Sequence, residues 1–391
     1  MVSDKNPGRR IRIWILPSCV PEIRMRSPFL DFPEEKFEFI YAPSWKAILN
    51  LPRLPDIIVF HRNACPLFAA ARMLEFARSH GITTVLDMDD LLTEMPPRHP
   101  TRSLYEAIRS ELVSIMKAVD VMIVATDSLK AHYLAYNPNI YVLPNLIDER
   151  IWSRGKRSAG SGNGKITIGY SGTTSHTYDL EIVTPAIKHI LSKYGDRVCF
   201  KFIGCITEEL KKMPGVYHIE EANPYTKYAQ VMKDCDFDFV FAVLEDVPFG
   251  RAKSNIKFLE YSICGYPGIY SKVGPYIDSV TDGKTGLLVD NTTGEWIRAM
   301  ELLINDPELR ARLGRNAQEH VRAGYLLKDR ASEWHRLYAD IISPGRKSGP
   351  TAYSMRPLVS YGPYMIYAYL KKKCHSFLDA IRSLHLQGGM R

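Results

Sequence analysis

Residues 153–170 read SRGKRSAGSGNGKITIGY and divide the chain into two parts. As far as Lys165 this stretch has no aliphatic side chain larger than alanine, which is typical of a linker or an exposed loop. It then changes into a short apolar run, Ile166–Tyr170, which predicts a strand. Short apolar strands alternate with amphipathic helices on both sides of this stretch, so the sequence predicts two α/β domains joined by a linker.

Each half has the alternation expected of a doubly wound, Rossmann-like parallel sheet. In such sheets ligands bind at the carboxyl ends of the strands, and two facing sheets therefore predict a site in the cleft between them. The predicted strands are 11–16, 37–41, 56–60, 83–86, 119–125 and 141–143 in the first half, and 166–170, 198–203, 237–243, 268–270 and 286–289 in the second. The predicted helices are 67–80, 103–117, 180–194, 225–234, 254–264, 294–305, 308–323 and 328–342. The predicted organisation is a first domain 1–150, a linker 151–165, a second domain 166–326, a closing helix 327–343 and a tail 344–391.

Composition and charge narrow the class of protein. The 391 residues are 46% apolar and 24% charged, as in ordinary globular proteins. The net charge is +8, but residues 344–391 carry eight Lys or Arg and one Asp, so the rest of the chain is nearly neutral and nucleic acid is not an expected partner. The seven cysteines occur singly, which argues against a zinc framework or a secreted disulfide scaffold and favours a cytoplasmic protein. No apolar run approaches the ~18 residues of a membrane span, and 11–16 is too short for a signal peptide.

The stretch Pro248–Pro267, PFGRAKSNIKFLEYSICGYP, predicts an anion site. A predicted strand leads into a glycine-containing loop, and a helix is expected to begin near Ser254, with Ser254 or Asn255 as its N-cap. Free backbone amides and the helix dipole favour an anion at that end.

Three charged residues share one face of this helix. Lys253, Lys257 and Glu260 are spaced at i, i+4 and i+7. Glu260 lies ~9 Å along the axis from Ser254 at 1.5 Å per residue, about the reach from a diphosphate to a ribose, and one carboxylate can accept hydrogen bonds from both ribose hydroxyls. The alternative is an ordinary surface helix with a Lys–Glu pair.

These residues resemble the donor-binding signature of glycosyltransferase family 4, the glycosyl transferases group 1, which are retaining enzymes of the GT-B fold. That signature has a Glu-x7-Glu pattern followed by a Cys/Leu-Gly-x-Pro turn. The matching residues are Glu260 with Cys264–Pro267, Asp282–Val289 as the family's "dGxtGlLv" strand, Leu313-Gly314, Asn316-Ala317, and the helix from Lys328 through Trp334. The resemblance covers roughly residues 11–342. It implies two Rossmann-like domains facing across a cleft, with the donor on the second domain, the acceptor on the first, and a helix 327–343 that crosses back to the first domain.

The chain departs from the family pattern at two places. Ala252 stands where the first Glu is usual, and the loop 172–179 lacks the usual Arg and Lys. The sequence thus resembles a subgroup that reads "GY-SG-T-TH-x-x-DL" and "KSNxKFLEY". We therefore expect Lys253, helped by Lys257, to neutralise the diphosphate. The other expected donor contacts are Gly172, Thr173, His176, Ser254, Asn255 and Glu260, with the base near 202–206 and 224–228; the alternative for 172–176 is a polar turn, and Tyr225 either stacks on the base or belongs to the core.

Three carboxylates, Asp87, Asp89 and Asp90, follow the predicted strand 83–86. One interpretation is a DxD metal motif, but that motif belongs to a different, single-domain fold. The resemblance instead places Asp90 at the aspartate of the family's His-Asp pair, with Asp89 in the histidine's place, for acceptor positioning or transition-state stabilisation. A further alternative is that these carboxylates cap the next helix.

Arginines near the same sheet edge are candidates for the acceptor side. Arg62 follows the strand 56–60 and is expected to face the cleft or to pair with one of the three aspartates. Arg24 and Arg26 follow the first strand and are candidates for contact with an anionic acceptor.

The tail 344–391 combines five tyrosines with Lys371-Lys372-Lys373 and a periodic apolar stretch. This pattern suits an anionic membrane surface, and the alternative is a tail that is poorly ordered or packs on the body.

The resemblance, together with these features, implies a retaining, metal-independent glycosyltransferase without a cofactor. It is expected to move a sugar from a nucleoside-diphosphate sugar to a hydroxyl of a glycan or lipid-linked glycan, in cell-surface glycan or polysaccharide biosynthesis. The expected catalytic residues are Lys253, Asp90 and Asp89, and the expected acceptor contacts are Asp87, Arg62 and Arg24. The alternatives are a nucleotide-sugar 2-epimerase of the same architecture and a non-catalytic binder of sugar nucleotides or glycans.

Overall fold

The structure is a computed structural model that describes residues 9–16, 22–41, 53–64, 67–152, 164–220 and 222–342. These residues belong to one compact unit, 1–349. Most of the predicted linker and the whole predicted tail 344–391 lie outside the described residues. No helix in the described part of the chain is long and apolar enough to cross a membrane.

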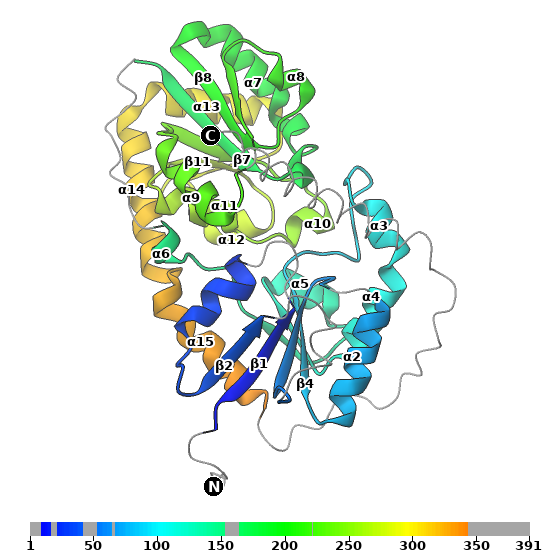
Figure 1. The fold of residues 1–391 in the computed structure, drawn as a ribbon. Helices are drawn as coiled ribbons and strands as arrows, with labels where there is room; N and C mark the ends of the chain where they lie inside the picture. Colours follow the sequence, from blue (N-terminus) through cyan, green and yellow to red (C-terminus); the bar gives the residue numbers. More distant parts are fainter. Residues whose placement is uncertain are drawn as a thin grey trace, which may run out of the picture. The chain divides into compact units, whose positions relative to one another are not determined.

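The first half forms a six-stranded sheet in which all neighbouring strands are parallel, in the order β2-β1-β3-β4-β5-β6 (Figure 1). The central strands are buried, as expected when helices cover both faces of a parallel sheet. The strands are β1 Ile11–Leu16, β2 Phe37–Tyr41, β3 Ile57–His61, β4 Thr83–Met88, β5 Val121–Val124 and β6 Ile140–Val142. The helices are η1 Glu22–Arg26, η2 Ser27–Asp31, α2 Leu67–Ser79, α3 Arg102–Ala107, α4 Arg109–Ala118, α5 Asp127–Tyr133 and α6 Glu149–Trp152.

The second half forms a second six-stranded parallel sheet, in the order β12-β11-β10-β7-β8-β9. The prediction of two doubly wound sheets is therefore confirmed. The strands are β7 Ile166–Gly172, β8 Val198–Gly204, β9 Val216–Ile219, β10 Phe239–Ala242, β11 Gly268–Ser271 and β12 Leu287–Val289. The helices are η3 Thr174–His176, α7 Leu180–Tyr194, η4 Gly195–Arg197, α8 Glu208–Lys211, α9 Tyr225–Asp234, α10 Pro248–Arg251, α11 Ile256–Ile263, α12 Pro275–Ser279, α13 Thr293–Asn305, α14 Pro307–Gly324 and α15 Leu327–Asp340.

Two predicted helices differ from the structure. The helix predicted over 103–117 is two helices, α3 and α4, because Ile108 leaves helical geometry at φ −105° and ψ 9° while its side chain is buried. The helix predicted over 254–264 begins only at Ile256. The short elements β9, α8, α10 and α12 were not predicted, since four or five residues carry too little periodicity.

The last helix, α15, packs on the first domain as predicted. Leu327, Trp334 and Tyr338 are buried in one hydrophobic cluster with side chains of β1, β3 and η2. Phe29 of η2 meets the rings of Trp334 and Tyr338 at centroid distances of 6.2 and 5.3 Å. The chain thus returns from the second sheet to the first (Figure 1).

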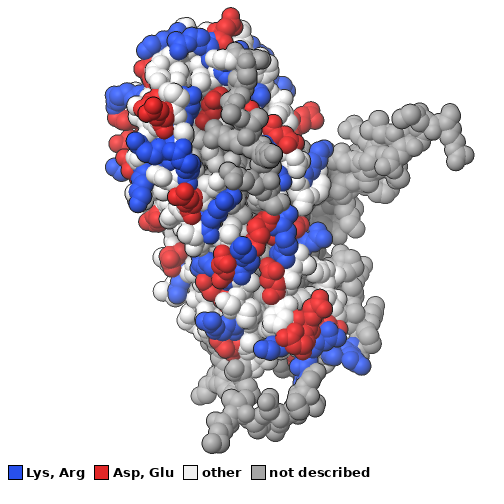
Figure 2. Space-filling view, turned by 90° about the vertical axis from the view of Figure 1, so that its left-hand side faces the viewer, with Lys and Arg blue, Asp and Glu red and all other residues white. Residues whose placement is uncertain are grey.

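Charged side chains of both signs intermingle on the face shown in Figure 2. Surface ion pairs among the described residues include that of Lys193 with Glu301 at 2.6 Å. Exposed pairs of this kind contribute little to stability.

Candidate active site

The N-terminus of α11 has no side-chain cap. Asn255 stands at the N-cap position, but its amide donates to Ser279 Oγ at 2.9 Å instead of accepting from the helix. Ser254 Oγ accepts a hydrogen bond from Asn145 Nδ2 at 2.9 Å. Both side chains predicted as caps are thus engaged elsewhere, and the first-turn amides of α11 remain available to a ligand.

Lys257, in the first turn of α11, is a buried cation, with 8% of its surface exposed. Within the described residues no carboxylate lies within 4.0 Å of its amine. Burial lowers the pKa of Lys257, and the nearby Lys253 acts in the same direction. A buried lysine without a carboxylate partner is costly, which points to an anionic ligand as its partner.

Lys253 is paired across the two domains. Its Nζ donates to Asp90 Oδ1 at 2.7 Å, and Asp90 Oδ2 lies 2.9 Å from Arg62 Nη2. Burial acts to raise the pKa of Asp90, but Lys253 and Arg62 outweigh it and hold this pKa below its ordinary value. The structure thus brings together the predicted catalytic residues Lys253 and Asp90.

Asp89 belongs to the same cluster. Arg62 Nε donates to Asp89 Oδ1, and His61 Nε2 lies 3.4 Å from the same oxygen. Burial opposes ionisation, yet Arg62 and His61 keep the pKa of Asp89 well below its ordinary value. The predicted pairing of Arg62 with an aspartate is confirmed. Because Asp89 and Asp90 are each matched by cationic side chains, they do not form an open set of metal ligands.

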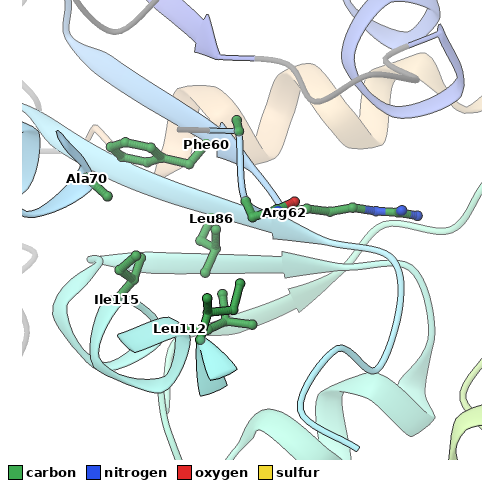
Figure 3. A pocket seen from close by; sticks show the side chains of 9 residues that line it. Phe60, Arg62, Ala70, Leu86, Leu112 and Ile115 are labelled. Atoms are coloured by element: carbon green, nitrogen blue, oxygen red, sulfur yellow. The ribbon is translucent and has the colours of Figure 1, made fainter. Parts of the chain in front are cut away.

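Arg62 lies at the edge of a pocket in the first domain. It adopts a left-handed backbone conformation, φ 51°, which is uncommon for a residue other than glycine and recurs at functional sites. Its side chain points away from the apolar side chains of the pocket, among them Leu86 and Leu112 (Figure 3). The lining residues are Phe60, Arg62, Asn63, Ala64, Ala70, Leu86, Ile108, Leu112 and Ile115.

Arg24 and Asp87, predicted to contact the acceptor, bind each other instead. Arg24 Nε and Nη2 donate to the two oxygens of Asp87 at 3.1 and 2.6 Å, and the exposed fractions of the residues are 1% and 0%. The guanidinium also donates to the carbonyl of Leu143 and lies over the ring of Trp334 at 4.9 Å. A fully buried, bidentate pair does not fit acceptor contact, and we assign the two residues a structural role. Arg26, by contrast, is exposed and lies 3.5 Å from Glu22.

The Glu260 carboxylate is buried between two tyrosines. Tyr225 donates to Oε1 at 2.7 Å and Tyr228 donates to Oε2 at 2.9 Å. Burial raises the pKa of Glu260 to about 7, although both tyrosines and Lys257 act against the rise. Tyr225 is therefore a partner of Glu260, a role not predicted from the sequence.

The loop after β7 presents a histidine held by an aspartate. His176 is buried, and its Nδ1 lies 2.8 Å from Asp179 Oδ2. Burial, with Lys257 and Lys253, holds the pKa of His176 well below its ordinary value, so the ring is neutral. Thr173 is exposed and bonds Ser175, and Gly172 ends β7 beside the first turn of the loop.

The donor-side loop is docked on the first domain. Phe249 and Ala252 are buried in the hydrophobic cluster of the first sheet, and the Ala252 carbonyl accepts from Thr126 Oγ1 at 3.1 Å. The departure from the family pattern at position 252 thus has a physical reason, since a glutamate there would bury a carboxylate in an apolar cluster.

His99 is a residue of this region that sequence analysis missed. It belongs to the first domain, yet its ring lies 5.2 Å from that of Phe249 and 6.1 Å from that of Tyr178. Burial and Lys253 lower the pKa of His99 to about 4. A lone histidine in a predicted loop carried no signal that could have identified it.

Comparison with known proteins agrees with this architecture. Residues 154–320 match the family described as Glycosyl transferases group 1. D-inositol 3-phosphate glycosyltransferase of Corynebacterium glutamicum is 33% identical over 106 residues, and N-acetyl-alpha-D-glucosaminyl L-malate synthase of Bacillus anthracis is 31% identical over 107 residues. Each match covers 27% of this chain, and the chain spans about a quarter of the length of these relatives, 25% and 26%.

Solved structures show the same fold at low sequence identity. HepE of Anabaena, crystallised with UDP and glucose, superposes with a TM-score of 0.60 at 13% identity, covering 85% of this chain and 100% of its own. TarM of S. aureus, crystallised with fondaparinux, alpha-GlcNAc-glycerol and UDP, gives a TM-score of 0.52 at 15% identity, covering 72% of this chain and 55% of its own.

The two sheets, the returning helix and the matching solved structures define the GT-B fold. Residues 154–320 match the Glycosyl transferases group 1 family, in agreement with the resemblance seen in the sequence.

Proposed function

We propose that this protein transfers a sugar, with retention of configuration, from a nucleoside-diphosphate sugar to a hydroxyl acceptor. The observation that carries the proposal is Lys257, a buried cation with no carboxylate within 4.0 Å among the described residues. It lies in the first turn of α11, whose amides no side chain caps. A diphosphate supplies the negative charge that both features require.

Glu260, one turn further along α11, suits the ribose of the same ligand. The two tyrosines use one acceptor position on each carboxylate oxygen, and each oxygen offers a second. Two adjacent hydroxyls can therefore bind without displacing the tyrosines. The spacing of Lys257 and Glu260 on one helix sets the distance between the charged and the sugar parts of the nucleotide.

The first domain contributes the acceptor side in this proposal. Asp90, Asp89 and Arg62 form one charged cluster that reaches Lys253 of the donor loop. When a donor binds, its diphosphate competes with Asp90 for Lys253. Released from Lys253, Asp90 is available to the acceptor hydroxyl or to the positive charge that develops on the transferred sugar.

The wider context remains a proposal from the sequence. We propose that the acceptor is a glycan or lipid-linked glycan of cell-surface polysaccharide synthesis, and that the enzyme acts in the cytoplasm beside an anionic membrane. No metal or cofactor is required in this scheme, because Lys257, Lys253 and the α11 amides supply the positive charge.

A direct test combines binding with turnover. The full-length protein is screened by thermal shift against UDP-, GDP-, ADP- and dTDP-glucose, since a specific ligand raises the melting temperature. The best ligand is then incubated without acceptor, and release of the nucleoside diphosphate is followed. We expect binding and slow release, both lost in Lys257→Met and retained in the control Lys193→Met, which alters an exposed lysine of the same domain. Binding without release would indicate a non-catalytic binder, and no binding of any nucleotide sugar would contradict the proposal.

A further inference from the structure

Two tyrosines of α9 hold the carboxylate on which the proposed donor site depends. Tyr225 and Tyr228 are three residues apart, so their hydroxyls reach the same side of α9 and meet the two oxygens of Glu260 at 2.7 and 2.9 Å. Their hydrogen bonds to other groups determine which way their protons point.

The direction of the Tyr225 hydroxyl is set by Trp152, the last residue of α6. The indole Nε1 lies 3.1 Å from the Tyr225 oxygen and can only donate. The Tyr225 oxygen therefore accepts this bond, and its own proton is directed to Glu260 Oε1. Trp152 also packs edge-on against both tyrosine rings, at 5.8 and 5.9 Å.

The Tyr228 hydroxyl also meets Ser171, next to Tyr261. The Tyr228 proton is donated to Glu260 Oε2 at 2.9 Å, so at the 2.8 Å contact with Ser171 Oγ the Tyr228 oxygen accepts from the serine. The backbone amide of Ser171 donates to the Tyr261 oxygen at 3.0 Å, and the Tyr261 hydroxyl lies 3.0 Å from Ser171 Oγ and donates to the Ser171 carbonyl at 3.4 Å. These contacts hold Ser171 beside Tyr228.

We propose that Tyr225 and Tyr228 are positioning residues that favour the ionised form of the Glu260 side chain and fix the plane in which its carboxylate meets the ribose diol. This inference rests on the proposed function. Both oxygens of Glu260 act as acceptors in this arrangement, which requires the carboxylate form, since a protonated carboxyl would place a donor against one of the tyrosine protons.

The other ionisable groups around Glu260 define how its charge responds to pH. Lys257 and Tyr261 belong to α11, Cys264 directly follows this helix, and Tyr276 of α12 also interacts with Glu260. Of these neighbours only Lys257 favours the carboxylate, along with the two tyrosines, while burial opposes it. Removing either tyrosine hydroxyl should therefore raise the pKa of Glu260 above about 7.

The raised pKa of Glu260 makes the folded protein more stable at low pH than at high pH. The folded protein binds a proton at Glu260 more tightly than the unfolded chain, whose carboxyl titrates near 4.5. The resulting stabilisation is complete below pH 4.5 and is lost as the pH rises through about 7. In Tyr225→Phe or Tyr228→Phe the pKa of Glu260 should be higher still, so the loss of folding stability should extend to higher pH.

The experiment measures melting temperatures of the full-length protein between pH 6 and pH 9, without ligand. In Tyr225→Phe and Tyr228→Phe we expect a larger fall in melting temperature over this range than in the natural protein. The fall should be smaller in Glu260→Gln, and Tyr225→Phe should add no pH dependence to Glu260→Gln. The control is Tyr266→Phe, which removes a buried hydroxyl that donates to the Met232 carbonyl, and should lower the melting temperature equally at every pH.

Nucleotide-sugar affinity gives the second measurement, with the member of the four-compound screen that gives the largest shift. The affinity should rise with pH as Glu260 ionises, and the midpoint of this rise should lie at higher pH in Tyr225→Phe and Tyr228→Phe than in the natural protein. If they keep the natural pH dependence of melting, the inference is overturned. If Glu260→Gln leaves nucleotide-sugar affinity unchanged while the melting data behave as expected, Glu260 does not bind the ribose. The effect of the two tyrosines on the ionisation of Glu260 would still be supported.

Discussion

Lys253 Nζ lies 2.7 Å from Asp90 Oδ1, and this contact joins residues 163 positions apart in the chain. Lys253 comes from the donor-side loop of the second domain, and Asp90 follows β4 of the first. The contact therefore ties the proposed donor site to the proposed acceptor side, and the same lysine has to serve either the aspartate or a diphosphate.

Replacing Asp90 with asparagine should destabilise the protein at neutral pH. Its side chain is 15% exposed and meets both Lys253 and Arg62, and removing one partner of such a pair costs about 3 kcal/mol. The pKa of Asp90 is lowered in the folded protein, so its contribution is present above its unfolded pKa and is lost as the pH falls through the folded one. Urea unfolding of Asp90→Asn and the natural protein should differ at pH 7, and the difference should shrink as the pH is lowered below 3.8. A difference that stays the same throughout this range would mean that the charge of Asp90 does not stabilise the fold.

Lys257→Met should raise stability and lower donor binding. The amine is buried with a lowered pKa, so its removal relieves a desolvation cost of about 1 kcal/mol. The same change removes a charged contact to the diphosphate, worth ~1.5–3 kcal/mol, or at least tenfold in affinity. Thermal melting and calorimetric titration measure the two effects. A variant that binds the nucleotide sugar as tightly as the natural protein would remove Lys257 from the donor site.

Glu260→Gln should weaken nucleotide-sugar binding without unfolding the protein. The amide keeps the shape of the side chain, but loss of a charged acceptor costs ~1.5–3 kcal/mol. Because burial raises the pKa of Glu260 to about 7, affinity in the natural protein should increase from pH 6 to pH 8, as the carboxylate forms. The variant should lack this increase. Calorimetry at both pH values checks the prediction, and equal affinities for the two proteins would contradict it.

Turnover should persist in EDTA. We expect the positive charge at the diphosphate to come from Lys257, Lys253 and the amides of α11. Asp87, Asp89 and Asp90 each meet an arginine, which leaves them poorly suited to hold a divalent ion. Product formation is measured before and after chelation. Activity that disappears with EDTA and returns with Mn²⁺ would show that a metal serves the reaction.

Deleting residues 344–391 should reduce binding to anionic vesicles while sparing turnover on a soluble acceptor. The segment carries eight basic residues, one aspartate and five tyrosines, and each basic residue near an anionic surface contributes about 1 kcal/mol. Sedimentation with phosphatidylserine vesicles should show a difference that shrinks as salt rises. Equal sedimentation of both proteins would remove the membrane role, and unfolding of the shortened protein would show that the segment packs on the body.

Much of the fold could be predicted from the sequence because its signals are local. Apolar runs such as Ile11–Leu16 and helical periods such as Leu180–Tyr194 appear in the structure with the same bounds. Lys257 and Glu260 could be placed on one helix face for the same reason, since the spacing of three residues needs no knowledge of distant contacts.

Partners of buried charges could not be predicted in this way. Asp87 and Asp90 stand three residues apart in one acidic cluster, yet Asp87 is neutralised by Arg24 within the first domain and Asp90 by Lys253 of the second. Nothing in the sequence distinguishes these two carboxylates, because Asp87 lies within β4 and Asp90 lies after it, and the partner of each depends on which distant residues the fold brings beside it.

The sequence by itself therefore determined the two parallel sheets, the family resemblance and the helix that carries Lys257 and Glu260. Only the tertiary structure decided that Ala252 packs into the first domain and that Tyr225 and Tyr228 enclose Glu260. The physical reason is the separation along the chain of the residues that interact. Strand and helix patterns are set by neighbouring residues, whereas burial, ion pairing and hydrogen-bond direction are set by groups that meet only when the chain is folded.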